Sequence, residues 1–470
     1  MRTVMKKLLQ ILTLSALTTA VSANVVTPNV VQPADVEQPQ LQESPTPGIQ
    51  DAYEHVVGMS NSYKHKLEKA LAKAGKKHIV TVGLSIQEVN DTTASQNWGA
   101  SRAVAYTKAM SEVRAGYVSS INVSIQTETL NKLFNTDDAP EITKADLNKA
   151  GNAFEEMLDK AVALANGKLD VALNELGVDP AQYNAAPVEK RKLMMRNFIA
   201  TKTKVTAYGD LSGMTVKRTF EATDVHGNTV VAVLTLVSPK MRDRVQSLLD
   251  SRGNIAADPA KIAKGIDINS WVVENEDKLI FEQGIKLMYD TNGMPMLVSF
   301  GQFPIKGYGT KKQLRSKAKF AKPHASNNAF ANFAELYNMN GQYKNATKSG
   351  VVTSQFETVK SNADGSIERD QKTLEKTINE INQTMKTAAN LNNAAGIKTI
   401  HTWMMMHPSN LQQMILGEVK VWSPESDKAA RQIRAGKVPT NTAQVLSATK
   451  AAEENSGAYE STLELDMDDF

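Results

Sequence analysis

Apolar and polar residues alternate in several short stretches of the chain, a pattern typical of strands that bury one face. Single strands are predicted at residues 78–89 and 118–127. Residues 214–223 and 228–237 flank a turn with Asp, Gly and Asn, and residues 285–298 surround a second turn of the same kind. Since such turns join antiparallel strands, both segments are predicted to be hairpins.

Between these stretches, apolar residues recur every three or four positions, which predicts helices. Asp51 stands directly before the first of them, where a carboxylate can accept hydrogen bonds from the first helical turn. Further helices are predicted at residues 102–117, 154–176, 187–200, 239–249, 314–337, 373–389 and 425–434. Helices mixed with antiparallel strands predict an α+β fold.

The second half of the chain repeats features of the first. Residues 213–220 (GMTVKRTF) and 396–403 (GIKTIHTW) share a glycine, a threonine and an aromatic residue at the same spacing. Downstream, Ser238-Pro239 corresponds to Ser423-Pro424. The order of predicted elements is also similar: strand, Ala-rich helix, strand, further helix, glycine turn and hairpin. We therefore predict two tandem, related α+β domains, with a single mixed domain as the alternative.

These patterns predict a first domain at residues 51–250 and a second at 269–436. Residues 251–268 join them and contain Gly253, Pro259 and Gly265, which is typical of a linker. The segment after 437 is rich in Ala, Thr, Ser and Glu, so residues 437–470 are predicted to form an acidic disordered tail.

The N-terminal residues have the pattern of a cleavable export signal. Arg2, Lys6 and Lys7 precede an apolar run, and small residues lead up to Ala23, so residues 1–23 are predicted to be removed. Residues 24–50 carry five prolines and predict a Pro/Gln-rich disordered spacer. The chain has no cysteine. An exported protein without disulfides indicates a bacterial periplasm, with secretion or outer-membrane association as alternatives.

The charge balance argues against a nucleic-acid partner. The chain has 54 basic and 50 acidic residues, and removal of the signal takes away three basic residues. A nearly neutral protein lacks the strong positive field that nucleic-acid binding requires. A local basic cluster lies in residues 311–322, and we interpret it as a solvated helix face rather than a patch for anionic lipid or polymer.

The Ala-rich helix between alternating strands, at residues 79–127 and again at 296–337, resembles a family of small bacterial envelope lipoproteins. Some members of that family help to build flagellar outer-membrane structures. The resemblance implies an α+β unit that acts within the envelope. This chain lacks the lipid-accepting cysteine of the family, so the resemblance does not extend to lipid attachment.

One segment carries candidate metal ligands. In HTWMMMH (residues 401–407), strand geometry would place His401, Trp403, Met405 and His407 on one face. Imidazole and thioether groups suit a soft ion such as Cu(I), so His401, Met405 and His407 form a candidate metal site. The alternative is that the methionines of this strand fill the core. No cofactor is predicted.

No recognised catalytic motif is present, and a thiol nucleophile is excluded by the absence of cysteine. We predict a non-enzymatic envelope protein that acts as a structural or assembly component, with other envelope proteins as partners. A periplasmic binding protein for a small ligand, peptide or soft metal ion is the alternative. A hydrolase whose triad lies scattered along the chain stays a third hypothesis. No membrane-spanning segment is predicted in the mature chain, and peripheral association with the envelope stays open.

Overall fold

The computed structural model describes residues 48–134, 141–148, 153–163, 167–306, 309–348, 371–386, 395–437 and 458–461. All of them belong to one compact unit, Thr46–Phe470. The predicted signal peptide and most of the predicted spacer and tail lie outside the described residues. Within the described part, no helix combines the length and apolar character needed to cross a membrane.

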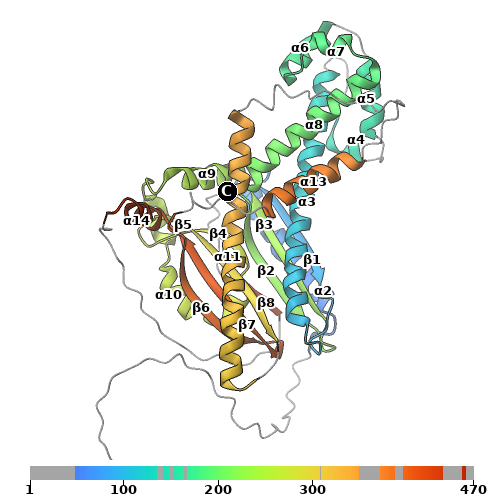
Figure 1. The fold of residues 1–470 in the computed structure, drawn as a ribbon. Coiled ribbons are helices and arrows are strands. Elements are labelled where there is room, and N and C mark those ends of the chain that lie inside the picture. Colours follow the sequence, from blue (N-terminus) through green and yellow to red (C-terminus); the bar gives the residue numbers. More distant parts are fainter. Residues whose placement is uncertain are drawn as a thin grey trace, which may run out of the picture. The chain divides into compact units, whose positions relative to one another are not determined.

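Two separate four-stranded antiparallel sheets confirm the predicted α+β class (Figure 1). Sheet A has the order β1-β3-β2-β8, and its strands are β1 (Thr81–Glu88), β3 (Thr229–Val237), β2 (Thr215–Thr223) and β8 (Ala458–Glu460). Sheet B has the order β4-β5-β7-β6, and its strands are β4 (Gly284–Tyr289), β5 (Pro295–Lys306), β7 (Asn410–Trp422) and β6 (Lys398–His407). Strand β8 gives part of the predicted disordered tail a defined structure, because it pairs with β2.

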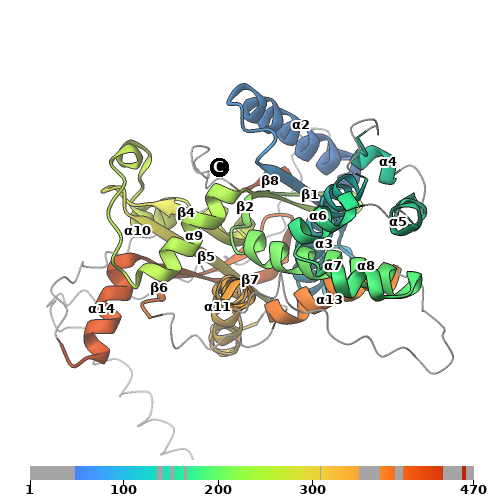
Figure 2. The same ribbon diagram turned by 90° about the horizontal axis from the view of Figure 1, so that it is seen from above.

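Helices cover the sheets and also form a lobe beyond them (Figures 1 and 2). The α-helices are α2 (Ala52–Lys73), α3 (Trp98–Leu133), α4 (Lys144–Asn148), α5 (Ala153–Ala163), α6 (Gly167–Leu176), α7 (Pro180–Ala185), α8 (Val188–Leu211), α9 (Pro239–Ser251), α10 (Ile268–Glu274), α11 (Lys311–Lys348), α13 (Gln371–Lys386) and α14 (Pro424–Arg434). Two 3₁₀-helices, η1 (Pro259–Lys264) and η2 (Glu276–Phe281), lie between α9 and β4. Residues of the predicted linker are thus partly helical.

Local sequence signals account for several of these elements. The Asp51 carboxylate accepts hydrogen bonds from the backbone N–H groups of Tyr53 and Glu54, as predicted for the N-cap of α2. The β2–β3 and β4–β5 turns are built alike: Asp224 and Asp290 each accept two backbone N–H groups of their own turn. Both predicted hairpins are therefore confirmed, and aspartate chemistry sets their turns.

The strand predicted at residues 118–127 is wrong, because these residues continue α3. Ile121 and Ile125 fit an alternating pattern, but they also lie four residues apart on one helix face. Together with Val118 they are buried in the helical lobe. Packing against the other helices of the lobe favours the helix over the strand for these residues. The helix predicted at 154–176 is described as two, α5 and α6.

The helical lobe consists of α4–α7 with the adjoining parts of α3, α8 and α13. Its core is apolar and includes Leu130, Leu158, Leu173, Tyr183 and Met195. A second large core lies between the sheets and their covering helices, and it contains side chains from both sheets, among them Phe220 and Trp403. The two sheets therefore share one apolar core.

The two hairpins that carry the sequence similarity have matching geometry. Thr215 pairs with Leu236 and Lys398 pairs with Val421, so each hairpin begins two residues after its glycine and two before its Ser-Pro. Both hairpins have a register shift at the equivalent position, around residue 217 in β2 and residue 400 in β6. Strand β6 has a second shift, between Met406 and His407. The central strand then pairs with β1 in sheet A and with β5 in sheet B.

The two glycines are also placed alike. A Cβ on Gly213 would lie 2.5 Å from the backbone of Arg242, at the start of α9. A Cβ on Gly396, whose φ is +88°, would lie 2.3 Å from the backbone of Asp427, at the start of α14. Each glycine thus allows the chain to pass closely against the helix that follows its hairpin.

Alanine at Gly396 is expected to lower the free energy of unfolding by about 1–3 kcal/mol, since it meets backbone atoms and an unfavourable φ. Alanine at Gly213 should have a similar effect. Urea denaturation measures both losses. Gly58, inside α2, is a matched control because a Cβ there meets no atom within 4 Å. Its replacement by alanine should be neutral or stabilising, and equal losses at Gly58 and Gly396 would contradict the role of close packing.

Candidate functional site

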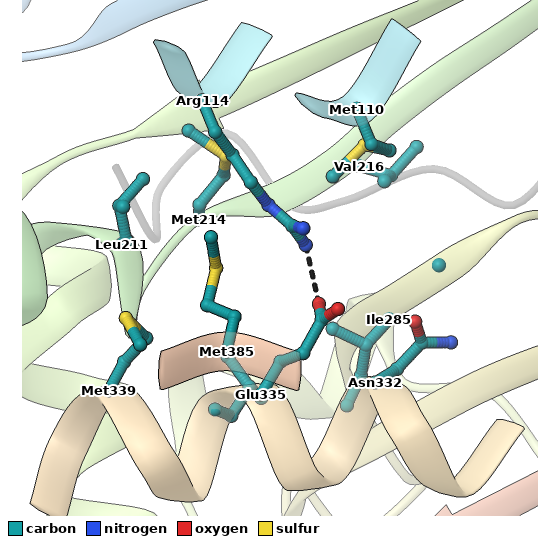
Figure 3. Close-up of a pocket in the computed structure, with 12 residues that line it drawn as sticks. Met110, Arg114, Leu211, Met214, Val216, Ile285, Asn332, Glu335, Met339 and Met385 are labelled. Atoms are coloured by element: carbon teal, nitrogen blue, oxygen red, sulfur yellow. Dashed lines mark hydrogen bonds and ion pairs between the residues drawn. The ribbon is translucent and has the colours of Figure 1, made fainter. Parts of the chain in front are cut away.

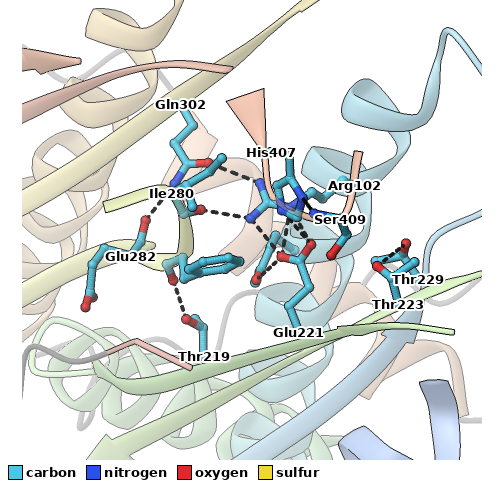
Figure 4. A network of polar contacts seen from close by, with 12 residues as sticks. Arg102, Thr219, Glu221, Thr223, Thr229, Ile280, Glu282, Gln302, His407 and Ser409 are labelled. Atoms are coloured by element: carbon cyan, nitrogen blue, oxygen red, sulfur yellow. Dashed lines mark hydrogen bonds and ion pairs between the residues drawn. The ribbon is translucent and has the colours of Figure 1, made fainter. Parts of the chain in front are cut away.

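The most concentrated polar chemistry of the described chain lies in the shared core. We call it the buried polar cluster: Arg102, Tyr106, Glu221, Gln302 and His407. Helix α3 contributes the arginine and the tyrosine, and strands β2, β5 and β6 contribute the other three (Figure 4). Its members come from both sheets and from segments more than 100 residues apart.

Glu221 is the centre of the cluster. Arg102 Nε donates to both of its carboxylate oxygens, at 2.9 and 2.8 Å, and Tyr106 donates its hydroxyl at 3.0 Å. The same guanidinium reaches sheet B, because it donates to Oε1 of Gln302 at 3.1 Å and to the carbonyl of Ile280 at 2.8 Å. Arg102 thus joins the two sheets through one side chain.

His407 closes the other side of the carboxylate. Its Nε2 lies 3.0 Å from Oε1 of Glu221. Its Nδ1 accepts the backbone N–H of Ser409 at 3.1 Å. The ring also packs edge-on against Trp98, with centroids 4.7 Å apart. The imidazole is therefore held by a hydrogen bond at Nδ1, by its close approach to Glu221 at Nε2 and by the ring of Trp98.

The protonation states follow from burial and charge. Burial alone would raise the pKa of Glu221, but the charge of Arg102 and the contact with His407 outweigh it and hold the pKa at about 2. Burial lowers the pKa of His407 below its ordinary value, although Glu221 opposes this. Burial also raises the pKa of Tyr106. At neutral pH the cluster therefore holds one ion pair, a neutral imidazole and a protonated phenol.

The cluster is closed to solvent: the side chains of Glu221 and His407 are 0% exposed and that of Arg102 is 3% exposed. A substrate could reach the carboxylate only if core residues moved. The geometry is that of a structural junction in which a buried charge is matched by a partner and by several hydrogen bonds.

The structure separates the predicted metal-ligand candidates. His401 lies with its Nε2 3.1 Å from Glu276 on η2, whereas His407 lies in the buried polar cluster. Met405 is partly buried against the shared core. Among the described residues, no group of three His, Asp or Glu side chains could hold a metal ion. A soft-metal site that uses thioethers stays a prediction, and it would have to displace the contacts of His407.

Sequence reasoning missed Arg102, Glu221 and Gln302. A weak signal was present, since Arg102 shares a helix face with Tyr106, and Glu221 lies in a strand next to the hairpin turn. A charged residue on an apolar face indicates a buried partner. The identity of that partner is set by tertiary packing and could not be derived from spacing.

A small pocket lies between helices α3, α8, α11 and α13 and strands β2 and β4. It is lined by four methionines, Met110, Met214, Met339 and Met385, and by the ion pair of Arg114 with Glu335 (Figure 3). Arg114 lies on α3 and Glu335 on α11, so this ion pair links the two longest helices. Flexible thioethers around a small space are typical of irregular packing and of soft-ligand binding alike.

Acidification should destabilise the protein through the buried polar cluster. His407 has a lowered pKa when folded, so below its ordinary value of 6.5 only the unfolded chain takes up this proton. Glu221 titrates near 2 when folded and near 4.5 otherwise, so it adds a further loss between these values. Its contribution is about 3 kcal/mol at neutral pH. Urea denaturation from pH 7 to pH 3 measures both.

The His407→Gln variant keeps an N–H group near Glu221 but cannot titrate, so the loss between pH 6.5 and 5 should disappear. The matched control His401→Gln alters a histidine that is partly exposed and outside the cluster. A wild-type stability that is constant from pH 7 to pH 5 would rule out a buried neutral His407.

The model of a domain of unknown function (DUF6844) matches residues 154–250, which include α6–α8, the β2–β3 hairpin and all but one residue each of α5 and α9. The 2.3 Å crystal structure of hypothetical protein FTT1539c from Francisella tularensis is similar with 20% sequence identity and a TM-score of 0.45, covering 81% of this chain and 93% of that chain. No curated protein matches the sequence. None of these findings carries information about function.

Proposed function

We propose that this chain is a non-enzymatic protein of the bacterial envelope and acts as a structural or assembly component through protein–protein contacts. The closure of the buried polar cluster carries the proposal. Its carboxylate and imidazole, the groups best suited to acid–base chemistry, are spent on joining the two sheets. Groups that are paired inside a closed junction do not meet a substrate, which favours a scaffold over an enzyme that would use them.

We also propose that the two halves are tandem copies of one α+β unit. The supporting observations are the matched register and bulge of the β2–β3 and β6–β7 hairpins, and the matched positions of Gly213 and Gly396. Each unit runs from a strand through a long helix to a hairpin and a Ser-Pro-capped helix. Two copies present two related surfaces to partners.

The proposed location is the periplasm. Support comes from the signal pattern of residues 1–23, the Pro/Gln-rich spacer after it, and the absence of cysteine. Cleavage after Ala23 would leave Asn24 as the mature N-terminus. Peripheral attachment to the envelope is part of this proposal, since a spacer would let the folded unit stand away from a surface.

In-cell photo-crosslinking tests the proposal. A photoreactive residue would replace Val171, which is 60% exposed on the helical lobe, or Phe320, which is 66% exposed on α11. Large exposed apolar side chains are favoured sites of protein contact. Glu68, a polar residue on α2 whose side chain is 40% exposed, is the control position.

The expected result is a covalent adduct with a defined envelope protein at Val171 or Phe320 and a weaker one, or none, at Glu68. Reciprocal crosslinking from the identified partner would have to return this chain. The proposal is overturned if all three positions give no adduct in exported protein, or if the chain with Met1 intact is recovered from the cytoplasm.

The methionine-lined pocket favours the alternative, a periplasmic binding protein for a small ligand or soft metal ion. Thioethers select Cu(I) and similar ions. Calorimetric titration with Ag(I), a stable analogue of Cu(I), tests this alternative. A stoichiometric binding step that is lost in Met339→Leu, and kept in the control Met59→Leu on α2, would favour binding over scaffolding. Equal heat changes for Met339→Leu and Met59→Leu would rule out the pocket as the binding site.

A further inference from the structure

The outer edge of β2 shows what kind of segment this fold can accept. Strand β8 pairs with it antiparallel, with Phe220 opposite Glu460. Ser461 donates its backbone N–H to the carbonyl of Thr219, and the N–H of Thr219 donates to Oγ of Ser461, both at 3.0 Å. The backbone of Thr219 therefore points outward, away from β3.

Side chains add specificity to this pairing. Glu460 forms an ion pair with Arg218 at 3.0 Å. The ring of Tyr459 stacks on Phe281, with centroids 4.3 Å apart and planes 7° from parallel. An extended segment is thus held by main-chain hydrogen bonds and selected by an acidic and an aromatic residue, which is the logic of strand addition.

Strand β6 has the same place in sheet B as β2 has in sheet A. The matched register puts Thr402 at the position of Thr219, and His401 at the position of Arg218. The backbone N–H and C=O of Thr402 should therefore point outward, because alternate residues of an antiparallel edge strand face away from their partner.

This edge of β6 pairs with no strand in the part of the chain that the structure describes. Lys398, Thr399 and Thr402 are exposed along it. His401 is only partly buried and contacts Glu276. Helix α10 and η2 contact β6, but an edge of this length without a partner strand is a template for pairing with another chain. The edge strand lies on the outer side of its sheet in Figure 1.

We propose that the outer edge of β6 is a strand-acceptor site for an extended, acidic segment of a partner protein. The segment would run antiparallel to β6, with a carboxylate facing His401 and a small hydroxyl residue opposite Thr402. These contacts would repeat those that residues 458–461 make on β2: antiparallel strand pairing, an ion pair from Glu460 and a hydroxyl contact from Ser461. The chain's own segment already fills the β2 edge, whereas the corresponding edge of β6 has no partner strand among the described residues. This inference names the contact surface for the proposed assembly function and rests on it for the partner.

Cysteine trapping tests the site directly, because the natural chain has no cysteine. The probe is a synthetic peptide with the sequence of residues 456–464 in which cysteine replaces the residue equivalent to Ser461. The full mature chain would carry either Thr402→Cys or, as the matched control, Thr219→Cys. A hydrogen-bonded strand pair brings the two Cα atoms within disulfide range.

We expect a disulfide adduct at Thr402→Cys and little at Thr219→Cys, whose edge is occupied. No adduct at Thr402→Cys with excess peptide overturns the proposal, as does equal reaction at both positions. Covalent dimers of a chain carrying both Thr402→Cys and Ser461→Cys, at a rate the peptide does not reduce, would assign the edge to a second copy and overturn the partner assignment.

Two variants test the recognition chemistry by fluorescence anisotropy with the unmodified, labelled peptide. Thr402→Pro removes the outward N–H without removing a bond to β7, and should weaken binding about tenfold. His401→Arg copies Arg218 and should tighten binding about threefold. A chain whose affinity is unchanged by both variants does not use this edge. These experiments use purified protein and are independent of in-cell crosslinking. The β6 site can therefore be ruled out while crosslinking still supports an assembly role, and the assembly role can be ruled out while the peptide still binds β6.

Discussion

Replacing Glu221 with glutamine is expected to lower the free energy of unfolding by about 3–5 kcal/mol, one of the largest losses available in this chain. The substitution keeps the shape of the side chain but leaves the guanidinium of Arg102 buried without its counter-charge. It also leaves Tyr106 with a weaker acceptor. Urea denaturation at pH 7 measures the loss, and circular dichroism shows whether the variant is folded.

The matched control is Glu276→Gln. Glu276 also contacts a histidine, His401, but its side chain is 27% exposed, so its loss should cost less than about 1 kcal/mol. The double variant Arg102→Met with Glu221→Gln removes both charges. It should recover part of the stability, because an uncompensated buried charge costs more than the absence of the pair. A Glu221→Gln loss as small as that of Glu276→Gln would show that the cluster is open to water.

Local chemistry explains why parts of the fold could be predicted. The Asp-based turns around Gly227 and Gly293 and the N-cap at Asp51 depend on residues close together in the sequence. The Ser-Pro helix starts are of the same kind: Ser238 and Ser423 each accept an N–H from the first turn of α9 or α14. Such signals are readable because the atoms involved are a few residues apart.

Long-range packing explains what could not be predicted. Residues 118–127 fit both a strand and a helix, and burial in the helical lobe selected the helix. In the segment 401–407, regular alternation would place both histidines on one face. The alternation is kept as far as Met406, since Trp403 and Met405 pack in the shared core and Met404 and Met406 in a separate cluster. A register shift follows between Met406 and His407, and His407 is fully buried beside Glu221 while His401 stays partly exposed beside Glu276. Sequence periodicity does not reveal a bulge.

The buried polar cluster was hidden for a related reason. Arg102 and Glu221 are separated by 119 residues, and Arg102 and Gln302 by 200 residues. Nothing in their spacing marks them as partners. The proposed repeat between the halves rests in the sequence on a few identities. Its strongest support is the matched register of the two hairpins, which only the folded structure shows.

Replacing Trp403 with alanine is expected to cost about 3–5 kcal/mol of stability. The indole is 3% exposed and packs directly over Gly417 on β7, where a Cβ would lie 2.2 Å from its ring. Truncation therefore opens a large cavity that a glycine on the facing strand cannot fill. The corresponding residue in β2, Phe220, is 1% exposed, and Phe220→Ala should show a loss of the same size.

Met405→Ala is the matched control on the same strand, since its side chain is only partly buried, and it should cost less than Trp403→Ala. Measuring each variant with and without a chelator separates the two interpretations of residues 401–407. If Trp403 packs the core, its loss reduces stability equally in both conditions. If it covers a bound metal ion, the wild type is stabilised by the metal and the chelator lowers its stability to that of the variant. Its burial in the shared core, together with the match to Phe220, leads us to expect the first result.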